Sequence, residues 1–348
     1  MHVTRDLLRK LPKAELHVHL DGSLRPETML ELAREYGEAM PAEDAEGLRA
    51  YMRVKDAANL TDYLARFATT LSVMQTADAL ERIAYELAED AARENVRYLE
   101  VRYCPALHTE AGLPLAETVD APLRGLGRAE ADLGVKTGLI VCGLRHLPPA
   151  SAAEMGELAA AYKGRGVVAY DLAGGEQGNP PGNFLDGFHP AMEADLPITV
   201  HAGEAAGAES IREALGVCRA NRIGHGTRLG EDESLLAYVR DQRVPLEVCL
   251  TSNVQTRAAT DFASHPLRRY FDQGLQLSVN TDNRLMSATT VSEELWRAHQ
   301  HLGFDWDELV ELTVMSFESA FLPWQEKQEL VLAVVDEIER LEQDAPAD

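Results

Sequence analysis

The sequence predicts an α/β fold, a (β/α)8 barrel with extra helices after strand one and at the C-terminus. Strand-like and helix-like segments alternate along nearly all of its 348 residues, and such alternation implies a parallel sheet. Eight strand-like segments are present, the number that closes such a sheet into a barrel. A doubly wound open sheet is the alternative architecture. No long linker or low-complexity segment divides the chain, so residues 1–348 are expected to form a single domain.

Each expected strand is a short apolar run that ends at polar or glycine-rich residues. In the first of them, the apolar side chains of Leu16, Val18 and Leu20 indicate a buried strand. The expected strands are Ala14–Leu20, Val96–Tyr103, Val135–Cys142, Val167–Leu172, Ile198–His201, Arg222–Gly224, Leu246–Leu250 and Leu277–Asn280.

The segments between the strands have helical features. Pro26 opens Pro26–Tyr36 at a position where proline favours a helix start. The segment Ala58–Met74 is amphipathic, because apolar side chains recur along it at helical spacing. These side chains are Leu60, Tyr63, Leu64, Phe67 and Leu71. The other expected helices are Asp78–Glu94, Pro114–Gly134, Ser151–Tyr162, Gly187–Ala194, Ala208–Arg219, Glu231–Gln242, Pro266–Gln273, Thr290–Leu302, Asp307–Ser319 and Pro323–Leu341.

The composition limits the partners and the location of the protein. The formal net charge is −24, so its surface repels phosphates and disfavours both nucleic acid and anionic membranes as partners. A small-molecule substrate is expected instead. The four cysteines form no CxxC pair and indicate reduced thiols in a cytoplasmic protein. No secretory signal or membrane-length apolar run is visible, and no feature indicates an oligomeric state.

A pair of histidines in the first strand offers metal-binding chemistry. His17 and His19 lie two residues apart, so their side chains point to the same face of the strand. Two adjacent imidazoles can bind a borderline metal such as zinc. Two hydrogen-bonded core histidines are the alternative interpretation of this pair alone.

Polar residues also follow the later strands, where the active site of such a barrel lies. They are Asp171–Glu176, His201–Glu204, Gly224–Gly226, Thr251–Asn253 and Asn280–Asn283. Each has a simpler interpretation by itself: Glu204 as a helix-opening residue, His225 as a turn residue and Asp282 as a helix cap. These interpretations are largely independent and all would have to hold together, so a shared site is favoured.

The fragments HVHLDG, DLAG, HAGE, GHG and NTDN, in this order, resemble the adenosine deaminase family of the amidohydrolase superfamily, from Leu11 to about Lys327. The resemblance implies one zinc ion per chain, held by four protein ligands. Those ligands would be His17, His19, His201 and Asp282. It further implies that Glu204 protonates the purine N1, that His225 orients the attacking water, and that Asp282 also accepts the proton of that water.

The resemblance also implies a substrate and the residues that bind it. The expected reaction is hydrolytic deamination of adenosine and 2′-deoxyadenosine to inosine or 2′-deoxyinosine and ammonia, as in purine salvage. Asp21 would bind the ribose 5′-hydroxyl, the N–H of Gly174 would bind N3, and His19 would face the substrate. Asn283 would contact N7, where many family members have aspartate. A hydrophobic gate would comprise Leu60, Tyr63, Leu64 and Phe67.

Three other functions were weighed. A binuclear hydrolase of the same superfamily often carries a bridging lysine after strand four, and Val167–Asp171 has none. A non-catalytic barrel would have lost ligands or the acid, yet all of them are present. A related deaminase acting on aminodeoxyfutalosine or adenine is the alternative substrate class, against which Asp21 favours a nucleoside with a free 5′-hydroxyl.

The remaining histidines show no pattern that joins them to a site. His108 mimics the H-x-E motif of cytidine-type deaminases but lacks its P-C-x-x-C half. No site role is expected for the others, which are His146, His189, His265, His299 and His301.

Overall fold

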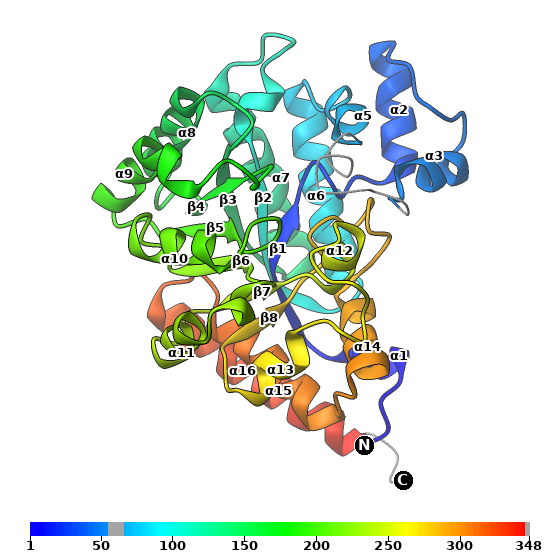
Figure 1. The fold of residues 1–348 in the computed structure, drawn as a ribbon. Coiled ribbons are helices and arrows are strands. Elements are labelled where there is room, and N and C mark those ends of the chain that lie inside the picture. Colours follow the sequence, from blue (N-terminus) through cyan, green and yellow to red (C-terminus); the bar gives the residue numbers. More distant parts are fainter. Residues whose placement is uncertain (55–65, 345–348) are drawn as a thin grey trace.

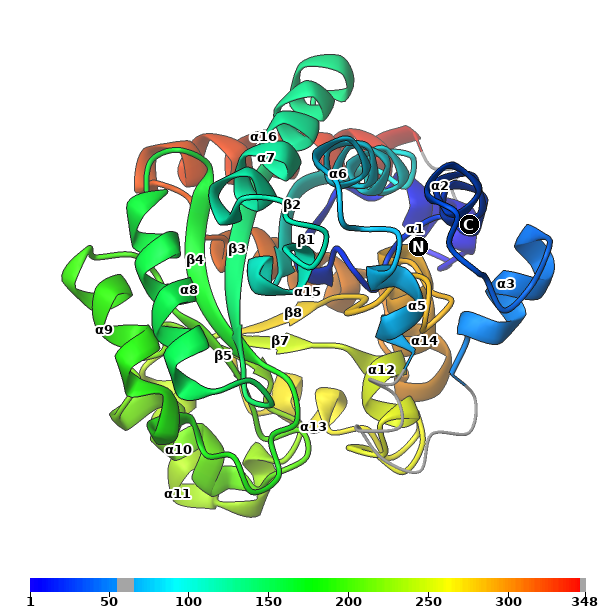
Figure 2. The same ribbon diagram turned by 90° about the horizontal axis from the view of Figure 1, so that it is seen from above.

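The computed structural model describes residues 1–54 and 66–344, and in this part of the chain eight strands lie at the centre with helices around them (Figure 1 and Figure 2). Every strand is parallel to its neighbours. The strands are β1 Lys13–His19, β2 Val96–Tyr103, β3 Lys136–Leu144, β4 Val167–Ala173, β5 Thr199–Ala202, β6 Arg222–His225, β7 Leu246–Val248 and β8 Leu277–Val279.

The strands form two four-stranded sheets that meet along two seams. One sheet has the order β1-β2-β3-β4 and the other β5-β6-β7-β8. A parallel bridge between Tyr170 and Ile198 joins β4 to the start of β5, and a second bridge between Val18 and Asp282 joins β1 to the chain after β8. These bridges close the ring, so the predicted (β/α)8 barrel is confirmed and the open sheet is excluded.

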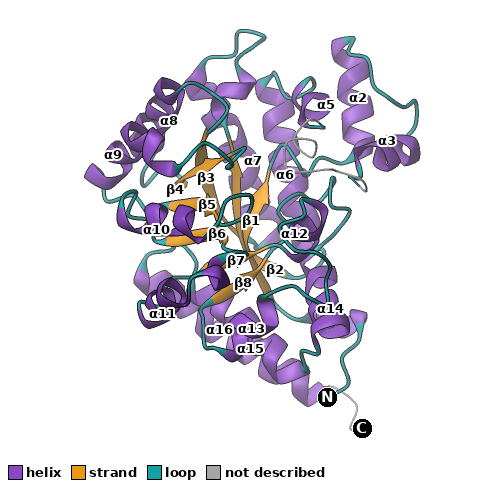
Figure 3. Cartoon of the chain, in the orientation of Figure 1, coloured by secondary structure: helices purple, strands orange, loops and turns teal. Residues whose placement is uncertain are grey.

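Helices follow the strands and cover the outside of the barrel (Figure 3). They are α1 Arg5–Lys10, α2 Pro26–Tyr36, α3 Ala45–Met52, α5 Phe67–Leu71, α6 Ala77–Ala92, α7 Leu115–Leu133, α8 Pro149–Ala161, α9 Leu185–Glu193, α10 Ala208–Gly216, α11 Glu233–Asp241, α12 Leu250–Gln255, α13 Leu267–Asp272, α14 Val291–Leu302, α15 Trp306–Glu318 and α16 Trp324–Asp344. Short 3-10 turns are η1 Pro105–His108, η2 Pro181–Phe184 and η3 Leu229–Glu231. None of the helices described is both long enough and apolar enough to cross a membrane.

The extra helices expected after strand one and at the C-terminus are present, with local corrections. Residues 55–65 lie outside the described residues, and Leu60, Tyr63 and Leu64 lie among them. In the remaining part of the expected helix Ala58–Met74, α5 ends at Leu71 and not at Met74. The helices α1, α3 and α12 were not predicted from the sequence.

The expected seventh strand was too long. The structure ends β7 at Val248, and Leu250 already opens α12. A short apolar run fits a buried strand and a buried helix equally well, which explains the error. The correction moves Ser252 and Asn253 into the first turn of a helix, so their side chains are held by regular backbone and not by a loose strand end.

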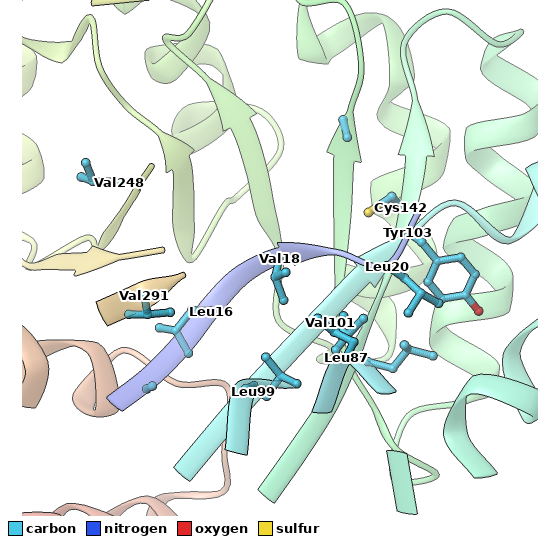
Figure 4. Packing of buried hydrophobic residues seen from close by; sticks show 14 of the residues in the cluster. Leu16, Val18, Leu20, Leu87, Leu99, Val101, Tyr103, Cys142, Val248 and Val291 are labelled. Atoms are coloured by element: carbon cyan, nitrogen blue, oxygen red, sulfur yellow. The ribbon is translucent and has the colours of Figure 1, made fainter. Parts of the chain in front are cut away.

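The alternation along β1 separates the core from the site. Leu16, Val18 and Leu20 are fully buried among side chains of β2 and α6, including Leu87 and Val101 (Figure 4). Side chains at the odd positions of a strand point to the opposite face, which here is the barrel interior. The apolar face therefore anchors the strand, and the opposite face carries His17 into the centre of the barrel.

Candidate functional site

A cavity of about 480 Å³ opens at the carboxyl ends of the strands. Nearly every site residue expected within the described chain lines it. Those residues are His19, Asp21, Phe67, Gly174, His201, Glu204, His225, Asp282 and Asn283. They follow five different strands, apart from Phe67, which comes from α5. The barrel thus places residues that are distant in sequence around one space.

Four buried side chains and the partly buried His19 form a metal-binding cluster in the cavity. One ligand atom each of His17, His201, His225 and Asp282 lies within 4.8 Å of the other three. Nε2 of His19 lies 3.3 Å from Nε2 of His201 and 3.3 Å from Oδ1 of Asp282. The structure therefore brings all four expected ligands together and adds His225 to the group.

The environment of His17 shows that a metal ion fits this cluster. Oε2 of Glu247 lies 2.8 Å from Nδ1 of His17. Nε2 of His17 is buried without a hydrogen-bond partner in the described residues, and burial lowers the pKa of the ring to about 4. A neutral imidazole with an unpaired nitrogen beside other imidazoles and a carboxylate is a donor set suited to zinc.

His201 is oriented by a carboxylate in the same way. Its Nδ1 lies 3.0 Å from Oδ2 of Asp171, which leaves Nε2 directed toward the cluster. The pKa of His201 is raised, because attraction to Asp171 outweighs the lowering effect of burial. Asp171 is a fully buried partner of the imidazole.

A buried ion network lies beneath the cluster and links these carboxylates. Arg102 donates to Oε2 of Glu247 at 2.8 Å and to Oδ2 of Asp171 at 3.1 Å. Arg222 donates to Oε1 of Glu247 at 2.7 Å and pairs with Glu100 on β2. These residues belong to the four strands β2, β4, β6 and β7, so the network fixes these strands relative to one another. Breaking such a buried pair typically costs about 3–5 kcal/mol.

Two site residues adopt left-handed backbone conformations. The φ angle is 62° at His225 and 63° at Asp282, a region that costs a non-glycine residue on the order of 1–3 kcal/mol. Hydrogen bonds hold Asp282 there: its N–H donates to the carbonyl of His17 at 2.9 Å, and its carbonyl accepts from His19 at 2.7 Å. Strain at Asp282 is thus tied directly to the seam between β8 and β1.

Glu204 faces the same cavity from the loop after β5. Its Oε2 lies 3.6 Å from Nε2 of His225, and the hydroxyl of Thr256 donates to its Oε1 at 2.9 Å. Burial raises the pKa of the Glu204 carboxyl. The carboxylate of Glu176 accepts backbone N–H groups from the four residues 203–206 at 2.7–3.0 Å. That loop is therefore held rigidly, and a protonated carboxyl is favoured at its tip.

The opposite wall of the cavity carries unpaired polar groups. Oδ1 of Asp21 and Oδ1 of Asn283 are buried without hydrogen-bond partners in the described residues. Burial raises the pKa of Asp21 to about 7. Asn283 lies against Gly22, where a Cβ atom would come within 1.8 Å of Oδ1. Gly174 adopts a φ of 88° beside His146, so glycine is required at that turn.

Comparison with known proteins assigns the chain to a family. The adenosine deaminase family model matches residues 12–337. The adenosine deaminase of Mycolicibacterium vanbaalenii is 42% identical over 97% of this chain and 96% of its own length. The chain belongs to the adenosine deaminase family. The predicted family and the predicted class of enzyme, a hydrolytic deaminase, are thereby confirmed.

Solved structures of proteins described by other activities share this architecture. Adenine deaminase from Arthrobacter aurescens is 32% identical, with a TM-score of 0.87 over 94% of this chain and 99% of that chain. A zinc-bound amidohydrolase from Burkholderia ambifaria is 25% identical, with a TM-score of 0.89 over 99% and 95% of the two chains. The N6-mAMP deaminase of Arabidopsis is 28% identical, with a TM-score of 0.84 over 95% and 99%.

Several residues of the adenosine deaminase site were missed from the sequence. His146 lines the cavity and His265 belongs to a hydrogen-bond chain that reaches His225, so the expectation that neither has a site role is wrong. Arg102 and Glu247 were also missed. A charged residue inside an apolar strand, as at Arg102 and Glu247, was the available signal, since such a residue is buried only with partners.

Proposed function

We propose that the chain catalyses the hydrolytic deamination of adenosine and 2′-deoxyadenosine, releasing ammonia and leaving inosine or 2′-deoxyinosine. The observation that carries the proposal is the position of the buried acid Glu204, which shares one cavity with the metal-binding cluster. One group can protonate a base there while an adjacent site activates water.

The cofactor in this proposal is one zinc ion per chain, held by His17, His19, His201 and Asp282. A zinc ion bound there would lower the pKa of a water ligand to about 7 and supply a nucleophile at neutral pH. Glu247 and Asp171 support the proposal, because each fixes the orientation of one imidazole ligand. With no bridging lysine after β4, a second metal ion has no ligand of that kind.

Glu204 is the proton donor in this proposal. Burial raises its pKa, which favours the protonated form that a proton donor needs. Transfer of that proton to N1 of the purine withdraws electron density from C6 and makes it open to attack. The Thr256 hydroxyl fixes the carboxyl group through Oε1, leaving Oε2 free to face the ring.

His225 and Asp282 act on the attacking water. Nε2 of His225 lies on the same side of the cavity as Glu204, at 3.6 Å from its Oε2, and can donate a hydrogen bond to the oxygen that adds to C6. Asp282 can accept the proton that this water loses, while the Ser252 hydroxyl holds its Oδ2 at 2.6 Å. A second proton transfer to the amino group then releases ammonia.

The substrate is held at its ribose and purine edges. Asp21 would accept from the 5′-hydroxyl, the N–H of Gly174 would donate to N3, and the amide of Asn283 would donate to N7. Phe67 lines the cavity, where it would form part of the expected hydrophobic gate. Aminodeoxyfutalosine or adenine is the alternative substrate. The buried, unpaired Asp21 favours a nucleoside with a free 5′-hydroxyl.

A substrate panel combined with metal analysis tests this function. Purified, unchelated protein should contain one equivalent of zinc and deaminate adenosine and 2′-deoxyadenosine far faster than AMP or adenine. Two equivalents of metal, or none, would contradict the cofactor assignment. A larger kcat/KM for a 5′-substituted nucleoside such as aminodeoxyfutalosine would show a deaminase with a different substrate. The proposal also includes a single domain over residues 1–348 and a cytoplasmic location.

A further inference from the structure

A chain of buried hydrogen bonds runs from the backbone of α13 to the ring of His225. The N–H of Leu267 donates to Nδ1 of His265 at 3.1 Å. Nε2 of His265 lies 3.1 Å from Oδ1 of Asn253, and Nδ2 of Asn253 lies 3.0 Å from Nδ1 of His225. The exposed fractions of His225, Asn253 and His265 are 1%, 0% and 4%, so solvent competes little for these bonds.

The backbone N–H of Leu267, at one end of this series of hydrogen bonds, determines which atom donates and which accepts in each of the others. A backbone N–H can only donate, so Nδ1 of His265 must offer a lone pair, and this ring carries its proton on Nε2. Burial, which lowers the pKa of His265 to about 3, agrees with a neutral ring. The proton on Nε2 needs an acceptor, which makes the facing atom of Asn253 its carbonyl oxygen.

The orientation of the Asn253 amide then fixes the next ring. With Oδ1 bonded to His265, the NH2 group of Asn253 faces Nδ1 of His225 and donates to it. Two donors cannot face each other, so Nδ1 of His225 carries no proton, and the neutral ring carries its proton on Nε2. That nitrogen points into the cavity, 3.6 Å from Oε2 of Glu204.

We propose that Asn253 and His265 are positioning residues that hold His225 as the neutral tautomer with its proton on Nε2. In this tautomer His225 donates a hydrogen bond into the cavity and has no lone pair there for a metal ion. The five side chains of the cluster therefore divide into four ligands and one donor. What the donor does in deamination rests on the proposed function, whereas the tautomer can be measured without any substrate.

The tautomer is measured by nitrogen NMR on the metal-loaded full chain with 15N-labelled histidine. Protonated and unprotonated ring nitrogens resonate in separate ranges, and comparison with His225→Gln identifies the signals of His225. We expect Nδ1 in the unprotonated range and Nε2 in the protonated range. A protonated Nδ1 in the parent protein would overturn the proposal, even if the protein deaminates adenosine.

The first variant reverses one hydrogen bond and keeps the side-chain shape. In Asn253→Asp, a carboxylate faces His225 and can only accept, so Nδ1 becomes protonated. We expect kcat to fall about 10–100-fold, as for other groups that orient site residues, with KM and zinc content near those of the parent. An unchanged tautomer, or an unchanged kcat, in a folded Asn253→Asp protein would contradict the proposal.

A second pair of variants tests His265, the residue farther from His225. This pair keeps the proposal testable if Asn253→Asp does not fold. In His265→Gln an amide N–H can replace the Nε2 donor, so the tautomer and kcat should stay close to those of the parent. In His265→Leu the donor is lost, and kcat should fall about tenfold. His299→Leu is the matched control, because that ring also bonds to backbone, at Phe304, but outside the site. Equal kcat in His265→Leu and this control would reject a positioning role for His265.

Discussion

Oε2 of Glu247 accepts a hydrogen bond from Nδ1 of His17 at 2.8 Å, and neither side chain is exposed to solvent. Arg102 and Arg222 both donate to Glu247, and against the opposing effect of burial they hold the pKa of this carboxyl well below its usual range, which favours the ionised form. An ionised carboxylate only accepts. Nε2 of His17 therefore keeps its lone pair directed at the cluster.

Replacing Glu247 by glutamine should weaken both metal binding and the fold. Loss of the charge that orients His17 should lower metal affinity about 10–100-fold. Arg102 and Arg222 lose an ionic partner, which should reduce the free energy of unfolding by about 3–5 kcal/mol. Chelator competition and urea denaturation measure the two effects. Glu293→Gln, which removes the surface pair with Arg5, should change neither by much; equal effects of the two variants would contradict this prediction.

Replacing Glu204 by glutamine should leave the metal in place and remove most turnover. An amide cannot transfer a proton to N1, and loss of a general acid typically lowers the rate ~10²–10⁴-fold. Metal content and kcat for adenosine should be measured on the same preparation. Glu231→Gln, on an exposed turn of η3, is the matched control. A Glu204→Gln protein with nearly normal kcat would show that another group donates the proton.

Replacing Asp21 by alanine should lower the preference for adenosine over its 5′-deoxy analogue and should have less effect on the rate of the chemical step. Because the pKa of Asp21 is raised to about 7, the assay is made at about pH 8.5, where the carboxyl is mostly ionised; there, loss of its hydrogen bond from the ribose 5′-hydroxyl should cost on the order of 1.5–3 kcal/mol in kcat/KM for adenosine. The analogue 5′-deoxyadenosine lacks this hydroxyl, so its kcat/KM should change little. The ratio of kcat/KM for adenosine to kcat/KM for 5′-deoxyadenosine should therefore decrease. Equal losses for both substrates would assign Asp21 a structural role and not a recognition role.

His108 should make the fold sensitive to acid. Its ring, at the end of η1, is fully buried against Tyr103, and Nδ1 lies 2.9 Å from the carbonyl oxygen of Met74. Burial lowers its pKa from 6.5 to about 4. Between these values the unfolded chain binds a proton that the folded chain does not, so stability is complete above pH 6.5 and falls as the pH drops toward 4. The loss approaches about 3 kcal/mol at pH 4.

Urea denaturation of the parent and of His108→Gln between pH 7 and pH 4 measures this effect. Glutamine can donate to the same carbonyl but does not titrate, so the stability advantage of the parent should shrink as the pH falls. Titration elsewhere, including at the metal cluster, cancels in the difference. A difference that is constant over this pH range would contradict the prediction.

The barrel and its site edge were predictable because their signals are local. Continuous apolar runs alternate along the sequence with segments whose apolar residues recur at helical spacing, and this pattern gives the order of strands and helices. Parallel strands then bring their carboxyl ends to one edge of the barrel. Residues at those ends, such as His19, Glu204 and Asp282, could therefore be assigned to one site before the structure. Proline at the start of α2 is equally local, and its position agrees with the structure.

The supporting residues were not predictable, because their roles depend on distant strands. Arg102 and Glu247 are single charged residues in separate apolar strands and become partners only when the barrel closes. Asn253 lies in α12, which the sequence pattern assigned to a strand end, and His265 lies just before α13, so the bond between them had no local signal. A left-handed backbone at Asp282 likewise follows from the seam with β1 and not from its neighbours.

The two seams of the barrel give the metal ion a second effect. His17 and His19 stand on the first sheet, whereas His201 and Asp282 stand on or beside the second, so an ion held by both sheets binds only the closed ring. Its binding adds to the free energy of unfolding by mass action, about 2.7 kcal/mol when free metal is one hundred times its dissociation constant. In a cell short of metal, the abundance of the folded enzyme would therefore fall along with its activity.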